Sequence, residues 1–461
     1  MVESPLSILQ INSTDMRGGA EKVAWNLFRA YRARGHPSWL AVGEKRSEDP
    51  DVIPVPNEDS RSRIYLFCRD LSARIQQRSR VGAFLNWFTA GVAHLGSRMD
   101  ALAGIEDFRY PGTARLIDLA PQRPDILHAH NLHGGYFDLR ELPRLSRQVP
   151  WVLTLHDAWL LSGHCAHSVG CERWQTGCGH CPDLSLYPAI QRDATAYNWR
   201  RKRDIFAQSR LYVAAPSRWL MDKIERSMLV RGIVEMRVVP NGIDLAIFHP
   251  PKERYAARVA LGITDERFIL VTTGVELRRN RWKDYATLHD ALHILADQLP
   301  NRLPGQRVVL IALGDDAPGE QIGLVDIRPV PFEAEAQRMA LAYGAADLYV
   351  HATRADTFPT SVLEALACGA PVVGSKVGGI PEQVEEGRTG FLTPAGDAKA
   401  MAERIQQLMV DHALRQAMSA QAAERARCRF SLDRQVDSYL QWYEEMARSH
   451  AHSGPKKGKS K

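Results

Sequence analysis

The sequence predicts an α/β protein with two doubly wound domains. The chain has 461 residues, which is more than one hydrophobic core usually serves. A buried strand at residues 6–11, a helix at 20–34 and a strand at 39–42 form the opening of a doubly wound sheet. Two further apolar strands, at 268–274 and 308–314, end in glycine and belong to a second sheet.

Gly18 and Gly19 stand at the mouth of the first helix. Because they lack side chains, they let a phosphate or a sugar approach the backbone. A full G-x-G-x-x-G pattern is absent, so a plain tight turn explains the pair equally well.

Residues 60–103 combine arginines with apolar and aromatic side chains, among them Arg61, Arg69, Phe84 and Trp87. A basic amphipathic segment of this kind binds an anionic membrane surface. The alternative is a helical insertion that packs on its own domain, with long cationic side chains covering apolar surface.

Polar side chains follow two predicted strands. The strand at 125–128 precedes His130 and His133, and the strand that starts at Trp151 precedes His156 and Asp157. Open α/β sheets bind ligands at the carboxyl ends of their strands, so we expect these four side chains at a ligand site. The alternative is that the histidines are structural.

One loop carries Cys165, Cys171, Cys178 and Cys181. The glycine in Cys178-Gly-His-Cys181 lets the backbone turn so that both sulfurs face one ion. Four thiolates would close a tetrahedral zinc shell and leave no open position for catalysis. We therefore expect a structural zinc, with unligated thiols and disulfides as alternatives.

Four cationic side chains lie between a predicted strand and a predicted helix, namely Arg278, Arg279, Arg281 and Lys283. Cations in this position suit a diphosphate. The alternative is a solvated basic loop. Further along, Gly378 and Gly379 form a glycine turn at a helix start, which allows a ligand to come close.

A short, almost wholly apolar helix follows Asp356. Thr357 is expected to cap its start and Gly369 to end it. Its single carboxylate is Glu364, and a buried carboxylate is costly unless it is hydrogen-bonded. We expect Glu364 to face a cleft and hold a ligand, while the free N–H groups of the helix start suit an anion. The alternative is a solvated glutamate on an ordinary amphipathic helix.

Asp356 and Glu364, eight residues apart and followed by Ala-Leu-Ala-Cys-Gly-Ala-Pro-Val-Val, resemble the Glu-x7-Glu signature of family 4 retaining glycosyltransferases. Gly18-Gly19-Ala20-Glu21 matches a Gly-Gly-x-Glu motif of that family. The cysteine-rich loop resembles a bacterial branch of exopolysaccharide, or colanic-acid-type, biosynthesis. Two departures stand out, because Asp356 replaces a glutamate and Val275 replaces an arginine.

The resemblance implies the GT-B fold, in which two Rossmann-like domains face each other across a cleft. Residues 1–248 would form the acceptor domain, which includes the insertion at 60–103 and the cysteine-rich loop at 164–182. Residues 249–433 would bind the nucleotide sugar. A helix at 434–448 would cross back to the first domain, and the polar tail at 449–461 is expected to be disordered.

The resemblance also implies the reaction, in which a retaining hexosyltransferase moves a sugar from a UDP- or GDP-sugar to a saccharide or lipid-linked saccharide. Glu364 would hold the ribose, Asp356 the sugar hydroxyls, and His156 the sugar or the acceptor. Lys283, with Arg279 or Arg281, would stabilise the leaving diphosphate, and no catalytic metal is needed. The donor side would also include Gly18, Gly19, Thr360, Ser361, Val362, Gly378 and Gly379. The acceptor side would include His130, His133, His156 and Asp157.

The net charge and hydropathy of the chain indicate which partners and which cellular location to expect. The net charge is +6, and Lys456, Lys457, Lys459 and Lys461 of the tail supply much of it, so nucleic acid is not the expected partner. We expect a cytoplasmic protein at the inner face of the cytoplasmic membrane. Two other functions stay open: a nucleotide-sugar epimerase of the same fold, and a non-catalytic peripheral membrane protein that binds a nucleotide sugar.

Overall fold

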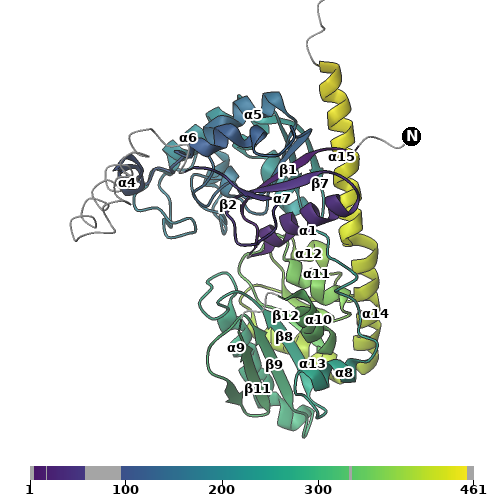
Figure 1. Cartoon of the computed structure of the whole chain (residues 1–461). Helices are drawn as coiled ribbons and strands as arrows, with labels where there is room; N and C mark the ends of the chain where they lie inside the picture. Colours follow the sequence, from purple (N-terminus) through teal and green to yellow (C-terminus); the bar gives the residue numbers. More distant parts are fainter. Residues whose placement is uncertain (1–4, 17, 58–94, 332–334, 454–461) are drawn as a thin grey trace, which may run out of the picture. The chain divides into compact units, whose positions relative to one another are not determined.

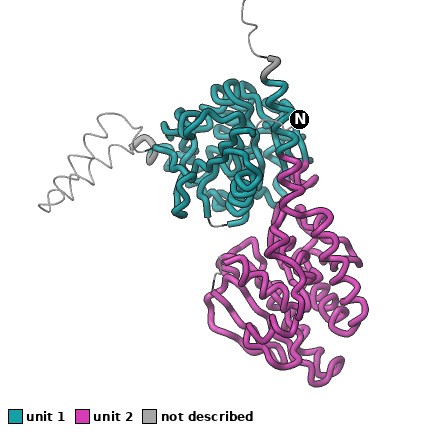
Figure 2. Tube along the Cα trace, turned by 45° about the vertical axis from the view of Figure 1, so that its right-hand side comes forward, with its two compact units in different colours: residues 1–215, 221–237, 440–461 teal, residues 216–220, 238–439 magenta. Residues whose placement is uncertain are grey.

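The computed structural model describes residues 5–16, 18–57, 95–331 and 335–453. The chain divides into two compact units (Figure 2). Unit 1 contains Met1–Ala215, Met221–Arg237 and Leu440–Lys461, and unit 2 contains Pro216–Leu220 and Val238–Tyr439. Most of the predicted insertion at 60–103 lies outside the described residues.

Unit 1 is built on a seven-stranded sheet of order β3-β2-β1-β4-β5-β6-β7 (Figure 1). The strands are β1 (Ile8–Thr14), β2 (Ser38–Glu44), β3 (Val52–Pro54), β4 (Ile126–Ala129), β5 (Trp151–Thr154), β6 (Leu211–Ala215) and β7 (Ile233–Val238). The pairs from β3 to β6 are parallel, and the strand order reverses between β1 and β4. Their near-continuous burial is typical of a parallel sheet covered on both faces.

The helices of unit 1 bury one apolar face each. In α1 (Gly19–Ala33), Val23, Leu27 and Tyr31 recur at helical spacing and are buried. The other helices that lie wholly in this unit are α4 (Leu95–Leu102), α5 (Leu142–Gln148) and α6 (Thr195–Phe206), and α7 (Arg218–Glu225) starts in unit 2.

Unit 2 has a second seven-stranded sheet, of order β10-β11-β9-β8-β12-β13-β14. The strands are β8 (Phe268–Thr273), β9 (Val308–Leu313), β10 (Glu320–Ile322), β11 (Val325–Val330), β12 (Leu348–His351), β13 (Val372–Ser375) and β14 (Gly390–Thr393). Only β10 runs antiparallel to its neighbour among these described strands. Alternate residues of β8 enter two separate cores, one on each face of the sheet. The prediction of two doubly wound domains is therefore confirmed.

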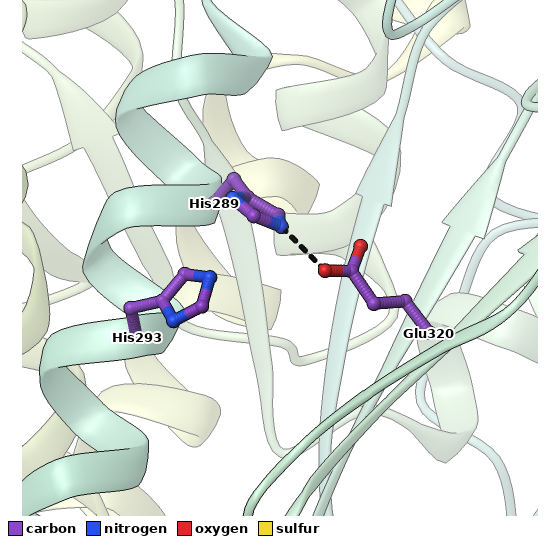
Figure 3. A group of neighbouring side chains, drawn as sticks. All are labelled: His289, His293 and Glu320. Atoms are coloured by element: carbon purple, nitrogen blue, oxygen red, sulfur yellow. Dashed lines mark hydrogen bonds and ion pairs between the residues drawn. The ribbon is translucent and has the colours of Figure 1, made fainter.

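Helices cover both faces of the second sheet. They are α8 (Arg254–Ala260), α9 (Tyr285–Arg302), α10 (Ala336–Ala345), α11 (Thr360–Ala367), α12 (Ile380–Gln383), α13 (Ala398–Val410) and α14 (His412–Arg429). At one edge, His289 of α9 lies 2.9 Å from Glu320 of β10, which joins this helix to the edge strand (Figure 3).

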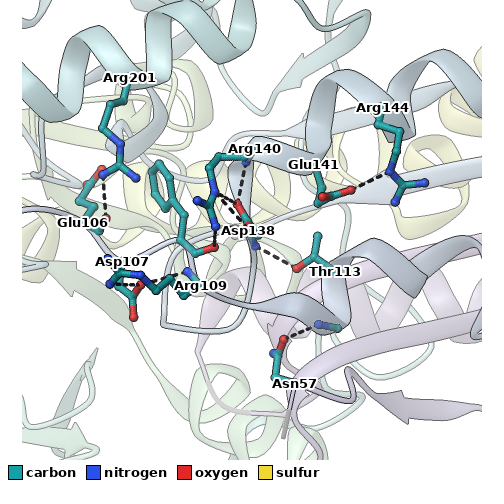
Figure 4. A network of polar contacts seen from close by, with 12 residues as sticks. Asn57, Glu106, Asp107, Arg109, Thr113, Asp138, Arg140, Glu141, Arg144 and Arg201 are labelled. Carbon is teal, nitrogen blue, oxygen red and sulfur yellow. Dashed lines mark hydrogen bonds and ion pairs between the residues drawn. The ribbon is translucent and has the colours of Figure 1, made fainter. Parts of the chain in front are cut away.

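A polar network fixes the segment that enters β4 in unit 1 (Figure 4). Arg140 forms an ion pair with Asp138, and the backbone N–H of Asp138 donates to Thr113 Oγ1 at 2.9 Å. Arg201 of α6 donates to the backbone oxygen of Glu106 at 2.9 Å. These contacts hold residues 106–113 against α6 and against the turn at 138–141 that precedes α5.

The last helix, α15 (Leu432–Ser453), contributes its second half to unit 1. There the hydroxyl of Tyr443 lies 2.6 Å from His128 Nδ1 and 3.1 Å from the hydroxyl of Tyr31. The helix ends at Ser453, so the prediction that residues 449–453 are disordered is wrong. Among the helices of the described ranges, none is both long enough and apolar enough to cross a membrane.

Acidification is expected to destabilise unit 1. Burial lowers the pKa of His128 from 6.5 to about 3, so the unfolded chain takes up a proton that the folded state does not. The free energy of unfolding is therefore greatest above pH 6.5 and falls as the pH drops toward 3, by about 1.4 kcal/mol per pH unit for each such histidine. Denaturant titrations at several pH values, followed by tryptophan fluorescence, measure this slope. His128→Gln should flatten it and His412→Gln, on the exposed start of α14, should not; equal slopes in all three proteins would contradict the prediction.

Candidate functional site

Two predicted histidines meet at the edge of the sheet in unit 1. His130 Nδ1 lies 3.0 Å from His156 Nε2, and His130 Nε2 lies 2.9 Å from the side-chain oxygen of Gln10. Because that oxygen accepts, His130 Nε2 donates to it, and His130 Nδ1 then accepts the proton of His156 Nε2. Burial lowers the pKa of His156 to about 4, so this imidazole is neutral near pH 7. Its Nδ1 is left as the unprotonated nitrogen.

The other two predicted side chains form an ion pair beside this one. His133 Nε2 lies 2.8 Å from Asp157 Oδ2. Although burial favours the neutral forms, the pair raises the pKa of His133 and lowers that of Asp157 to about 2. The ring of Trp159 packs edge-on against His133 at 5.5 Å, and its backbone N–H donates to Asp157. The four side chains therefore lie together as one neutral pair and one charged pair.

The helix start at Gly18 and Gly19 is partly open. Gly18 is the N-cap of α1 with a φ of 95°, and a Cβ there would come within 2.5 Å of Glu21 Oε2. A Cβ on Gly19 would meet no atom of the described chain within 4 Å. Glu21 accepts a hydrogen bond from Ser13 at 3.0 Å, and burial raises the pKa of its carboxyl. This arrangement leaves room for a ligand at Gly19, while Gly18 is needed for the turn.

In unit 2, the structure brings Asp356 and Lys283 together. Lys283 Nζ lies 2.9 Å from Asp356 Oδ2, and His351 Nε2 lies 3.5 Å from the same oxygen. Burial would raise the pKa of Asp356, but the ammonium group of Lys283 and the nearby imidazole of His351 hold it well below its usual range, while burial lowers the pKa of His351 itself. His351, which ends β12, was not predicted; a histidine at the end of a strand is the same signal that identified His130 and His156.

Hydrogen bonds through the hydroxyl groups of Tyr349 and Thr273 connect His351 to the neighbouring strand β8. The Tyr349 hydroxyl lies 3.2 Å from His351 Nδ1 and 2.8 Å from Thr273 Oγ1. All three side chains are buried, and they join the ends of β8 and β12. The imidazole of His351 is therefore fixed in orientation on the side away from Asp356.

Glu364 lies inside the apolar helix as predicted, with only 3% of its surface exposed. The Tyr343 hydroxyl donates to Glu364 Oε2 at 3.2 Å. The predicted helix cap is wrong: α11 begins at Thr360 with Pro359 as its N-cap, and Thr357 Oγ1 is buried without a hydrogen-bond partner in the part of the chain that the structure describes. Proline fixes the extended backbone that precedes this helix and removes one N–H that would need a partner.

The glycine turn serves the Asp356 loop. A Cβ on Gly378 would come within 1.7 Å of the backbone oxygen of Asp356, and one on Gly379 within 2.1 Å of that of Thr357. We expected these glycines to face a ligand. That stays a prediction, and the missing Cβ atoms also allow the Asp356 loop to pack directly on the turn.

The three arginines of the basic loop differ. Arg278 donates to Asp315 Oδ2 at 2.7 Å and lies 4.9 Å over the ring of Tyr285, so it is held by unit 2 itself. Arg279 and Arg281 are exposed, and Arg281 lies 5.3 Å over the ring of Trp282. Both exposed arginines therefore stay candidates for the second cation, beside Lys283, that would contact a diphosphate.

The cysteine-rich loop folds around a buried lysine. Lys202 donates to Glu106 Oε1 at 2.8 Å and to the backbone oxygens of Trp159 and Ser162 at 3.0 and 3.1 Å. Lys202 was not predicted, because nothing near it in sequence indicates a buried ion pair.

Two of the four sulfurs have nearby hydrogen-bond partners. The Gly163 N–H lies 3.3 Å from Cys178 Sγ, and His164 Nε2 lies 3.4 Å from Cys181 Sγ. Burial, with neighbouring thiols adding to it, raises the pKa of Cys178 to about 12. Within the described ranges no three of these sulfurs lie within 4.8 Å of one another, whereas a tetrahedral Zn–S shell needs about 3.8 Å. The ligand chemistry fits zinc, and the loop would have to tighten to bind it.

Two family models match the chain. "Glycosyltransferase Family 4" matches residues 17–247, which is half of the chain, and "Glycosyl transferases group 1" matches residues 268–411. The putative colanic acid biosynthesis glycosyl transferase WcaC of Escherichia coli is 23% identical over 70% of this chain and 77% of its own. The D-inositol 3-phosphate glycosyltransferase of Jonesia denitrificans is 28% identical over 74% of this chain and 86% of its own.

Solved structures show the same fold. Sucrose-phosphate synthase from Thermosynechococcus elongatus aligns with a TM-score of 0.61 at 18% identity, covering 96% of this chain and all of that one. HepE from Anabaena, in complex with UDP-glucose, aligns with a TM-score of 0.58 at 20% identity over the same shares. The predicted GT-B fold is confirmed. The chain is a glycosyltransferase, and it belongs to glycosyltransferase family 4.

Proposed function

We propose that the protein transfers a hexose, with retention, from a nucleoside-diphosphate sugar to a saccharide or lipid-linked saccharide during polysaccharide biosynthesis. The observation that carries the proposal is the partly buried cluster of Lys283, Asp356 and His351 at the carboxyl end of β12. The similarity to a colanic acid biosynthesis enzyme supports the polysaccharide role. The UDP-glucose bound by HepE supports a nucleotide sugar as donor.

The donor side would work mainly by electrostatics. Negative charge develops on the diphosphate as it leaves, and fixed cations and N–H groups placed around it lower the barrier. Lys283 supplies a partly buried cation, and the backbone N–H groups of Thr360, Ser361 and Val362 lie at the start of α11. Arg279 or Arg281 would add a second cation from solvent. When the diphosphate binds, it would replace Asp356 as the partner of Lys283, which frees the carboxylate for the sugar hydroxyls.

The ribose would be held by Glu364. Its carboxylate accepts a hydrogen bond from the Tyr343 hydroxyl, and an ionised carboxylate offers about four acceptor sites in all. A ribose offers two neighbouring hydroxyl groups, and one carboxylate can accept from both. Burial strengthens these bonds because water does not compete.

On the acceptor side, the neutral His156 would bind a hydroxyl group of the sugar or acceptor. Because its Nδ1 is unprotonated, it accepts the hydroxyl proton in a hydrogen bond. The charged pair of His133 and Asp157 would orient the acceptor beside it. A lipid-linked acceptor would place the enzyme at the inner face of the cytoplasmic membrane, with the basic segment at 60–103 against the lipid headgroups.

A thermal-shift and turnover screen with UDP- and GDP-sugars tests the proposal. One donor is expected to raise the melting temperature and to release nucleotide slowly by hydrolysis, faster with acceptor. Conversion of the donor sugar into an epimer without acceptor would instead show an epimerase. Binding without any nucleotide release, in the presence of acceptor, would show a non-catalytic protein. No stabilisation by any donor in folded protein would contradict the proposal.

Two substitutions should separate donor binding from chemistry. Glu364→Gln is expected to raise the KM for the donor about 10- to 100-fold, because hydrogen bonds to a charged group are lost. Lys283→Gln is expected to lower kcat about 100- to 1,000-fold, because the cation acts on charge that develops in the transition state. Steady-state kinetics with the identified donor measures both. The controls are Glu403→Gln and Lys399→Gln on the exposed face of α13, and equal effects in variant and control would contradict the assignment.

We further propose that Cys165, Cys171, Cys178 and Cys181 hold one structural zinc ion, which would supply only a fixed geometry for the loop. The reduced wild-type protein is expected to contain about one zinc per chain more than Cys178→Ser, measured by atomic emission. Cys178→Ser should lose the metal and lower the melting temperature of unit 1. Cys428→Ser, on the exposed side of α14, should keep both. Wild-type protein that carries no zinc and is not stabilised by adding it would contradict the prediction.

A further inference from the structure

A second group of metal-binding side chains lies in unit 2. His289 and His293 stand one turn apart on the same face of α9, and Glu320 lies opposite them on β10 (Figure 3). One ligand atom from each of the three lies within 4.8 Å of the others. No other group of three histidine, cysteine or carboxylate side chains in the described ranges does so.

We propose that His289, His293 and Glu320 bind one divalent transition-metal ion of the zinc type, with water in the fourth position. Two imidazoles and one carboxylate form a ligand set that zinc prefers in proteins. The i, i+4 spacing on a helix places both imidazoles on one side of the ion. The proposed transfer reaction does not use these three residues.

The distances are close to those that a bound ion requires. Bonds of about 2.0–2.1 Å at tetrahedral angles place neighbouring ligand atoms about 3.3 Å apart. His289 Nε2 and Glu320 Oε1 are already 2.9 Å apart, so a metal would replace their hydrogen bond with little movement. The rings of His289 and His293 are 4.7 Å apart at 70°. His293 is exposed, so its ring can turn to complete the set.

Neighbouring groups support His289 and balance charge. The ring of Tyr285 packs on His289 at 5.8 Å. The guanidinium group of Arg278 lies over the same tyrosine ring, 4.9 Å from its centroid. Arg278 is paired with Asp315 at 2.7 Å, so its positive charge is largely compensated where a cation would bind. The ring contact restricts the orientation of His289, as outer-shell contacts do in metal sites.

A metal ion at this site would stabilise the edge of the second sheet. β10 has three residues, is an edge strand, and pairs only with β11 within the described sheet. A short edge strand is held by few backbone hydrogen bonds. A metal bound by two side chains of α9 and one of β10 would tie this strand to the helix. It would stabilise unit 2 by binding the folded state only.

Zinc binding to the full-length reduced protein tests the proposal. Equilibrium dialysis is expected to give one more equivalent of zinc for wild type than for His293→Gln, whatever the cysteines bind. Glu320→Gln, which keeps a hydrogen bond to His289, should lose the same equivalent. His412→Gln, at an exposed position elsewhere in unit 2, should keep it.

Thermal unfolding gives the second readout. Added zinc is expected to raise the melting temperature of unit 2 by several degrees in wild type and in His412→Gln, but not in His293→Gln or Glu320→Gln. Cobalt bound at this site should absorb in the visible without a sulfur-to-metal charge-transfer band. Equal zinc content and equal stabilisation in all four proteins would overturn the proposal. No sugar nucleotide is present, so the result is independent of the proposed transferase reaction.

Discussion

Parallel strand pairing brings the carboxyl ends of neighbouring strands to one edge of each sheet, and every candidate site residue in the two sheets depends on this constraint. In unit 1, Ala129 pairs with Ile11 and with Leu153, so the residues that follow β4 and β5 meet as His130 and His156. In unit 2, His351 pairs with Gly374, which sets the glycine turn under the Asp356 loop. The fold therefore supplies the position, and the side chains supply the chemistry.

The sites hold charge in buried places, and each charge has a partner. Taking a carboxylate such as Asp356 out of water costs several kcal/mol unless it is paired, and removing one partner of a buried pair costs about 3–5 kcal/mol. Lys283 provides that compensation for Asp356, as His133 does for Asp157. A site arranged in this way exchanges one partner for another when ligand binds. The charged side chains are already in place before the ligand binds, so the protein reorganises little during the reaction.

The sequence predicted the residues whose signal is local. Glu364 is identified by being the one carboxylate in an apolar helix, and His156 by following a strand. His351 carried the same signal as His156 but lay next to the stronger Asp356 motif. The pairs of Lys202 with Glu106 and of Arg278 with Asp315 join positions far apart in sequence, and no local pattern reveals them. The cap at Thr357 was wrong because Pro359, two residues on, sets the helix start.

The buried Lys202 connects the cysteine-rich loop to the acceptor residues. Its ammonium group lies 3.8 Å over the ring of Trp159 and donates to backbone oxygens at both ends of the turn that precedes Cys165. Trp159 in turn packs on His133, and its N–H groups hold Asp157 and Glu106. A change in the loop must therefore move Trp159 or break these contacts, because a close-packed interior does not absorb displacement. Because the Ser162 hydroxyl also donates to the backbone oxygen of Cys165 at 2.7 Å, this turn connects the start of the cysteine-rich loop to the charged pair beside His156.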